Sequence, residues 1–221
     1  MKSKTIIFDM DGVLFDTEIM STKAWIQLAK ERGLDGVIIQ ELADNCMGRN
    51  RKDIIFQFQK KFGENFDAQE FLTAGRSLMQ KWIERDGLPL MKGTVEILQY
   101  LRENHFTTGL ASSSSTQTVM SHMERSGLGH YFDVIIGGDQ VTLSKPKPDI
   151  YLKACEAVHM PPGEVIAVED SPNGIRAAHA AGMKTVMIPD LVQPDAEMLA
   201  LLYRKYDSLL ALKEAFERDE L

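Results

Sequence analysis

Short apolar runs and amphipathic segments alternate along the chain after about residue 90, and one further apolar run lies near its start. We expect five of these runs to form buried parallel strands, because each is short and nearly continuous: residues 5–8, 107–111, 134–136, 165–168 and 185–188. Segments with helical spacing of apolar residues lie between them and begin with helix-start signals at Thr94, Thr116, Asp149 and Ser171. This alternation predicts an α/β fold, with a Rossmann-like, doubly wound parallel sheet between two layers of helices.

The chain between the first and second expected strands follows a different pattern. Apolar residues keep helical spacing in three stretches, and no convincing strand intervenes: 19–29, 54–62 and 71–83. We therefore expect an all-helical cap at residues 16–87, inserted into a catalytic core made of residues 1–15 and 88–221. A cap that opens over a site would need hinges, which we place near residues 15–17 and 86–89. The alternative is that these helices simply extend the core.

Composition narrows the class of protein and its partners. A net charge of −7 argues against a dedicated nucleic-acid binder, since such proteins are usually basic. Cys46 and Cys155 form no C-x-x-C pair and give neither a disulfide nor a zinc pattern, which fits a reducing cytoplasm. The first apolar run is interrupted by Asp9 and Asp11 before it reaches the length of a signal peptide, and no run has the length of a membrane span. We expect a cytoplasmic protein with neither nucleic-acid nor membrane partners.

Two acidic residues directly follow the first apolar run. Asp9 and Asp11 are two positions apart, so on an extended chain their side chains project to the same side at the carboxyl edge of the sheet. Two carboxylates there repel each other unless a cation lies between them. Mg²⁺ is the natural partner, since it prefers oxygen ligands. The alternative for these residues alone is an ordinary turn rich in Asp and Gly.

Three later segments carry further candidate chemistry. The second expected strand ends in a serine run, Ser112 to Ser115, whose hydroxyl and backbone N–H groups precede a helix start and could bind a phosphate group. Lys145 lies in a loop that is restricted by Pro146 and Pro148. Another apolar run ends in Glu169 and Asp170, and a third carboxylate at the sheet edge is what a metal next to Asp9 would require. Each signal is weak alone, because loops are often serine-rich and a single lysine is usually a solvated charge.

In this order and spacing, the segments resemble the haloacid dehalogenase superfamily, specifically its phosphatases with a helical cap. The first motif matches the segment from Asp9 to Thr17, the second Ser112, the third Lys145 before Pro146, and the fourth the segment from Glu169 to Gly174. The resemblance covers the whole chain, and the four motifs together are specific. It implies a phosphoric monoester hydrolase that requires Mg²⁺.

The resemblance also implies a role for each residue of the site. Asp9 would be the nucleophile that forms an aspartyl phosphate, and Asp11 the general acid and base. Mg²⁺ would be bound by Asp9, by the backbone carbonyl of Asp11 and by Asp170, with Glu169 as a further ligand that binds directly or through water. Lys145 would offset the phosphoryl charge while the serine loop holds the oxygens, so the expected substrate contacts are with Ser112, Ser113, Ser114, Lys145 and, from the cap, Arg51.

A sugar-phosphate mutase of the β-phosphoglucomutase type is the nearest competing activity. That subgroup usually carries a histidine five residues after the aspartate matching Asp16, and a Lys-Gly-x-x-Arg loop in the cap. Here these positions hold Ser21 and Met47, and only Arg51 matches. We take the departures as evidence for hydrolysis. Three other basic cap residues compete with Arg51 for a substrate contact: Arg49, Lys52 and Arg76.

Two non-enzymatic classes are less favoured. A phospho-accepting receiver domain also has an acidic sheet edge and a later lysine, but it is a single compact domain without a helical insertion. The insertion in this chain makes sense as a lid over a small substrate. A catalytically inactive regulatory protein would not need the full set of polar residues found here. The sequence therefore predicts hydrolysis of a small phosphorylated metabolite, a sugar or sugar-alcohol phosphate. It leaves open the substrate itself, cap motion and the oligomeric state, for which a monomer is the simplest expectation.

Overall fold

The computed structural model describes residues 4–46 and 51–221. The chain divides into two compact units, one made of Met1–Asp16 and Leu88–Leu221 and the other of Thr17–Gly87. Every strand of the described residues lies in the first unit. None of the helices in the described parts of the chain is both long and apolar enough to span a membrane.

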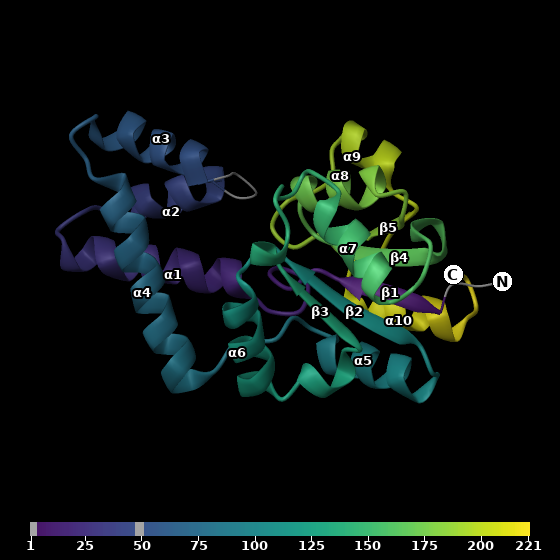
Figure 1. Cartoon of the computed structure of the whole chain (residues 1–221). Helices are drawn as coiled ribbons and strands as arrows, with labels where there is room; N and C mark the ends of the chain where they lie inside the picture. The colour runs from purple at the N-terminus through teal and green to yellow at the C-terminus, as the bar shows by residue number, and fades with distance from the viewer. Residues whose placement is uncertain (1–3, 47–50) are drawn as a thin grey trace. The chain divides into compact units, whose positions relative to one another are not determined.

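The first unit is built on one six-stranded sheet in which all neighbouring strands are parallel (Figure 1). The spatial order is β3-β2-β1-β4-β5-β6. The strands are β1 (Thr5–Phe8), β2 (Thr107–Ser112), β3 (Val134–Gly137), β4 (Val165–Glu169), β5 (Lys184–Met187) and β6 (Arg204–Lys205). The five predicted strands are present. The sequence pattern missed β6, because this edge strand has two residues, both charged and exposed.

Helices cover both faces of this sheet. They are α5 (Thr94–Glu103), α6 (Thr116–Ser126), α7 (Asp149–Ala157), α8 (Pro172–Ala180), α9 (Ala196–Leu201) and α10 (Leu209–Glu217), with short 3₁₀ helices at Gly129–Tyr131, Gly138–Gln140 and Pro162–Glu164. The first four match the predicted starts. The pattern did not predict α9 and α10. The predicted α/β fold, a doubly wound parallel sheet with an inserted helical segment, is confirmed.

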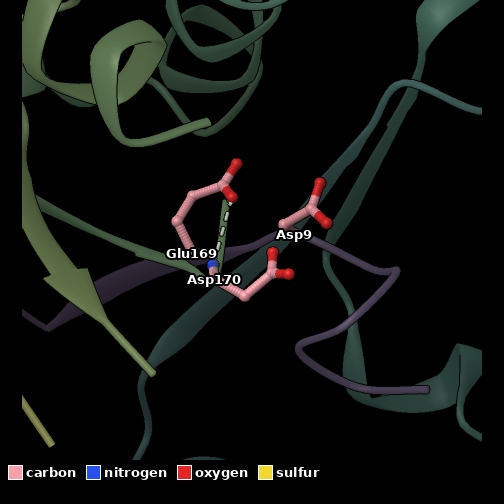
Figure 2. Close-up of side chains that lie close together, drawn as sticks. All are labelled: Asp9, Glu169 and Asp170. Atoms are coloured by element: carbon pink, nitrogen blue, oxygen red, sulfur yellow. Dashed lines mark hydrogen bonds between the residues drawn. The ribbon is translucent and has the colours of Figure 1, made fainter. Parts of the chain in front are cut away.

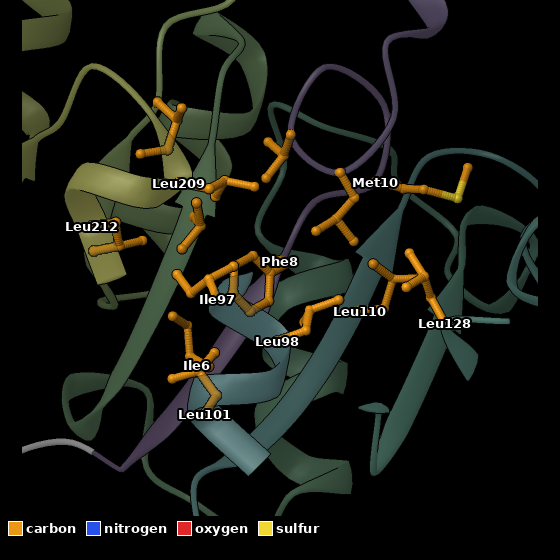
Figure 3. Packing of buried hydrophobic residues seen from close by; sticks show 14 of the residues in the cluster. Ile6, Phe8, Met10, Ile97, Leu98, Leu101, Leu110, Leu128, Leu209 and Leu212 are labelled. Atoms are coloured by element: carbon orange, nitrogen blue, oxygen red, sulfur yellow. The ribbon is translucent and has the colours of Figure 1, made fainter. Parts of the chain in front are cut away.

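The alternating side chains of β1 divide the core between the two faces. Ile6 and Phe8 pack into a cluster with residues of α5 and α10, whereas Ile7 belongs to a second cluster with residues of α7 and α8. Figure 3 shows the first cluster, with Phe8 among leucine and isoleucine side chains of the neighbouring helices and strands. Burial on both faces explains why the strands read as continuous apolar runs instead of alternating ones.

The second unit contains only helices among its described residues: α1 (Thr17–Glu31), α2 (Gly36–Cys46), α3 (Arg51–Phe62) and α4 (Ala68–Asp86). Its core centres on Phe58, which is fully buried. The Phe58 ring lies with its centroid 5.3 Å from those of Trp25 and Phe71 and about 6 Å from those of Phe62 and Phe66. This aromatic cluster gives the helical unit a hydrophobic core of its own.

This core generates a stability prediction. Replacing Phe58 by Ala should lower the free energy of unfolding by about 3–5 kcal/mol, because the ring is fully buried and the neighbouring rings cannot fill the cavity. Phe56, on the same helix, is 62% exposed and provides a matched control; its replacement by Ala should cost about 0.5 kcal/mol or less. Urea unfolding followed by tryptophan fluorescence measures both. Equal losses for the two variants would contradict the assigned core.

Candidate active site

The parallel register brings the ends of the central strands together at one edge of the sheet. Phe8 is level with Leu110 on β2 and with Val168 on β4. The backbone N–H of Asp9 donates to the carbonyl of Val168 at 2.9 Å, so the pairing continues one residue beyond β1. The polar residues at the ends of β1, β2 and β4 consequently meet where open α/β sheets bind their ligands.

Three carboxyl groups gather at this edge (Figure 2). One carboxylate oxygen from each of Asp9, Glu169 and Asp170 lies within 4.8 Å of the other two. Glu169 is fully buried and Asp9 is nearly so. Such closely spaced acidic groups repel one another when ionised, and burial strengthens the repulsion.

Lys145 supplies positive charge to this cluster. Its Nζ donates to Oδ1 of Asp9 at 2.5 Å and to Oε1 of Glu169 at 2.6 Å, and it also donates to the carbonyl of Ala111 at 3.2 Å. The lysine side chain is 7% exposed, so these pairs are shielded from water. Lys145, the lysine before Pro146, therefore lies in contact with Asp9.

The pKa values of these groups indicate an excess of negative charge. Burial raises the pKa of Asp9 to about 8; Lys145 opposes this rise, whereas Glu169 and Asp11 add to it. Burial also raises the pKa of Asp170 well above its ordinary value, as do Glu169 and Asp9. For Lys145, burial lowers the pKa of the ammonium, but Asp9 and Glu169 more than offset this and raise it. A second positive charge would favour the ionised carboxylates.

The donor set fits a hard divalent cation. Carboxylate oxygens of the kind that Asp9 and Asp170 offer here are the ligands that Mg²⁺ prefers. The backbone at Gly12, with φ of +79°, lies so close that a Cβ there would be 2.3 Å from Oδ2 of Asp170. A glycine is therefore required for the Asp170 carboxylate to keep this position. Glu169 differs from the other two acids, because both of its carboxylate oxygens accept hydrogen bonds from the protein.

The serine loop lies at the end of β2. Ser112 is fully buried, and its Oγ accepts a hydrogen bond from the backbone N–H of Ser114 at 3.1 Å. The hydroxyl of Ser114 donates to Oδ2 of Asp11 at 3.3 Å, which connects the loop to the first motif. Ser113 is exposed. The loop has the backbone and hydroxyl donors expected of an anion site, and one of its serines orients Asp11.

Sequence reasoning missed several residues that shape this edge. The N–H of Gly138 donates to the carbonyl of Ser114, and a Cβ at Gly138 would lie 2.4 Å from the Ser113 carbonyl, so the turn after β3 supports the serine loop. Gly174 is equally constrained, since a Cβ there would overlap the Glu169 carboxyl group. Its place in the fourth motif was a usable signal. Tyr151, which donates to Glu169, gave none, because it occupies an apolar position of α7.

The cap residues named from the sequence belong to the helical unit. Arg51 is exposed at the start of α3 and donates to Oε1 of Gln69 at 3.3 Å and to Oγ1 of Thr73 at 3.1 Å. Ser21 is half-buried in α1. Lys52 and Arg76 are exposed, while Met47 and Arg49 lie outside the described residues. The proposed substrate contact of Arg51 stays a prediction.

Comparison with known proteins identifies relatives along most of the chain. The fructose-1-phosphate phosphatase YqaB of Escherichia coli is 33% identical over 183 residues, 82% of this chain and 94% of the relative. A phosphorylated carbohydrates phosphatase of Thermotoga maritima is 30% identical over 186 residues, 83% of each chain. The expectation of a phosphoric monoester hydrolase is confirmed by these relatives.

A solved structure and a family model complete the comparison. The crystal structure of β-phosphoglucomutase from Clostridium difficile superposes with a TM-score of 0.72 over 99% of this chain and 96% of that one, at 22% identity, which shows a shared fold. The family model described as haloacid dehalogenase-like hydrolase matches residues 6–188, from β1 to just beyond β5. The predicted resemblance is confirmed: the chain belongs to the haloacid dehalogenase-like hydrolases.

Proposed function

We propose that the chain is a Mg²⁺-dependent phosphatase that hydrolyses a small phosphorylated metabolite, a sugar or sugar-alcohol phosphate, through an aspartyl phosphate on Asp9. One observation carries this proposal. The Nζ of Lys145 is held between Asp9 and Glu169, with Asp170 in the same cluster, at the edge where β1, β2 and β4 end. A nucleophilic carboxylate of Asp9 would have the Lys145 ammonium beside it and Asp170, a candidate metal ligand, in the same cluster.

The first half of the reaction transfers the phosphoryl group to the protein. A carboxylate oxygen of Asp9 attacks phosphorus, and the bond between phosphorus and the ester oxygen breaks. Asp11 protonates the leaving alkoxide, a task for which the hydrogen bond from Ser114 holds its carboxyl group. Lys145 offsets the charge that would otherwise repel Asp9 from a phosphate dianion. A bound Mg²⁺, held by Asp9, Asp170 and the Asp11 carbonyl, would supply further positive charge at the phosphoryl oxygens.

The second half returns Asp9 to its starting state. Asp11 is now a carboxylate and takes a proton from water, whose oxygen attacks phosphorus. The bond between phosphorus and the Asp9 oxygen breaks, and inorganic phosphate leaves. The buried hydroxyl of Ser112 and the N–H groups of the serine loop lie at the same edge and are the donors for the phosphoryl oxygens.

The substrate class is inferred from the relatives. Two of them are named as phosphatases of fructose 1-phosphate and of phosphorylated carbohydrates, and they cover more than four-fifths of the chain. The likeness to a β-phosphoglucomutase shows the fold alone and does not favour a mutase. Ser21 stands where the mutase pattern has a histidine. A serine hydroxyl acts as neither an acid nor a base near neutral pH. We also propose that the protein is cytoplasmic and that it has no nucleic-acid partner.

Replacement of Asp9 tests the nucleophile. Asp9→Asn should reduce phosphate release to less than about a hundredth of wild type, because an amide neither attacks phosphorus nor contributes a negative charge to the metal. Asp11→Asn should also lose most activity. Asp207→Asn, at a side chain that is 92% exposed, serves as the control and should leave kcat unchanged. Higher residual activity in a correctly folded Asp9→Asn protein, as judged by circular dichroism, would rule out the covalent route.

Removal of divalent metal tests the cation site. Excess chelator should lower phosphate release by more than about a hundredfold, because the cation supplies several kcal/mol of charge stabilisation. Added Mg²⁺ should restore activity, whereas Ca²⁺ should support it poorly, since its larger and looser coordination misplaces the carboxylate relative to phosphorus. Undiminished turnover in chelator would remove the metal from the proposal.

A coupled assay separates hydrolase from mutase. A mutase must return the phosphoryl group to a sugar hydroxyl before water removes it, and Ser21 cannot activate that hydroxyl as a histidine would. We expect phosphate release from several hexose or hexitol phosphates and no efficient conversion of β-glucose 1-phosphate to glucose 6-phosphate, even with a bisphosphate activator. Glucose-6-phosphate dehydrogenase detects the isomer beside a free-phosphate assay. Isomerisation faster than phosphate release would show a mutase.

A further inference from the structure

Tyr151 carries a polar group into an otherwise apolar cluster below the site. The residue is fully buried on α7 and packs with Ile7, Ala111 and other members of the cluster between the sheet, α7 and α8. Its hydroxyl donates to Oε1 of Glu169 at 2.5 Å. A phenylalanine ring would fill the same space, whereas a buried hydroxyl is costly unless it is hydrogen-bonded. Packing therefore does not explain why this position has a hydroxyl group. The hydrogen bond to Glu169 does explain it.

The same tyrosine also borders the ammonium of Lys145. The distance from Nζ to the tyrosine Oη is 3.3 Å, and Nζ lies 4.9 Å from the centroid of the ring, within range of a cation–π contact. Asp9 contacts the same Nζ at 2.5 Å. Lys145 is thus in contact with Tyr151 as well as with the two acids of the site.

Glu169 is clamped through both of its oxygens. Oε1 accepts from Tyr151 and from Lys145, and Oε2 accepts from the hydroxyl of Ser171 at 3.2 Å and from the N–H of Asp170 at 3.3 Å. The carboxyl group also fills the space left by the missing side chain of Gly174. Among the residues that the structure describes, removal of the tyrosine hydroxyl would leave Lys145 as the remaining donor to Oε1, and the carboxylate would be drawn toward the ammonium, away from its present place.

We propose that Tyr151 is a positioning residue, whose hydroxyl holds the Glu169 carboxylate and thereby keeps the Lys145 ammonium against Asp9. This inference rests on the proposed phosphatase function, because it concerns the lysine that offsets the phosphoryl charge. The hydroxyl touches neither the nucleophile nor the phosphoryl group, so its effect on turnover passes through Glu169 and Lys145. A charged acceptor in a water-free site makes this hydrogen bond a strong one.

The kinetic test compares Tyr151→Phe with Tyr100→Phe, a half-buried tyrosine of α5 in the other cluster. At saturating Mg²⁺, Tyr151→Phe should lower kcat about tenfold and change KM by less than about threefold, because the misplaced charge matters most in the transition state. Tyr100→Phe should leave kcat unchanged. Both should keep the wild-type circular dichroism spectrum, since each keeps its ring. Wild-type kcat in Tyr151→Phe would overturn the proposal.

A double-mutant cycle tests the route through Glu169. In a Glu169→Gln background, which removes the charge that the tyrosine hydroxyl holds, Tyr151→Phe should lower kcat by less than about threefold. A further tenfold loss in that background would show that Tyr151 does not act through Glu169, and it would overturn the proposal.

Crystal structures of wild type and Tyr151→Phe decide the geometric part without any turnover. We expect the Glu169 carboxylate to rotate and the contact between Nζ of Lys145 and Oδ1 of Asp9 to lengthen from 2.5 Å. Unchanged positions of Glu169 and Lys145 would overturn the positioning role even if kcat had fallen. If wild type released no phosphate from any sugar phosphate, the proposed function would fail, while this structural comparison would still decide whether Tyr151 positions the pair.

Discussion

The charge balance among Asp9, Glu169, Asp170 and Lys145 is the constraint on which the rest of this structure depends. Three acids within 4.8 Å of one another, two of them deeply buried, cannot all be ionised beside a single ammonium without a large electrostatic cost. Burial, and after it repulsion from the neighbouring acids, raises the pKa values of Asp9 and Asp170. A divalent cation would offset part of the negative charge of these acids, which is the role that the proposed function gives it.

The fold keeps these charges in place with backbone more than with side chains. Parallel pairing sets the ends of β1, β2 and β4 level, and the apolar strands behind them keep water out. Glycines are found where a side chain would collide with the site: Gly12 against Asp170, Gly174 against Glu169, and Gly138 against the serine loop. The acidic groups have little freedom to relax by moving apart, which is what preorganisation of an active site requires.

Sequence reasoning succeeded where a signal is local and failed where it depends on contacts between distant segments. The five longer strands are apolar runs that periodicity located, and Asp9, Ser112, Glu169 and Asp170 lie at the ends of such runs, where the order of the four motifs singled them out. Lys145 was found through Pro146, which follows it, and through the order of motifs. The role of Tyr151 could not be predicted from the sequence, because an aromatic residue on the apolar face of a helix is normally a core residue. Only the packing of α7 below β4 reveals the partner of its hydroxyl.

The two candidate activities differ in the acceptor of the phosphoryl group. Hydrolase and mutase both need a nucleophile, a counter-charge and a proton donor, and the roles proposed for Asp9, Lys145 and Asp11 would serve either. What separates them is whether water or a sugar hydroxyl reaches the aspartyl phosphate. Control over that choice must come from groups that recognise the rest of the substrate. Arg51, which donates to Gln69 and Thr73 on α4, is the residue of the helical unit for which we predict such a role.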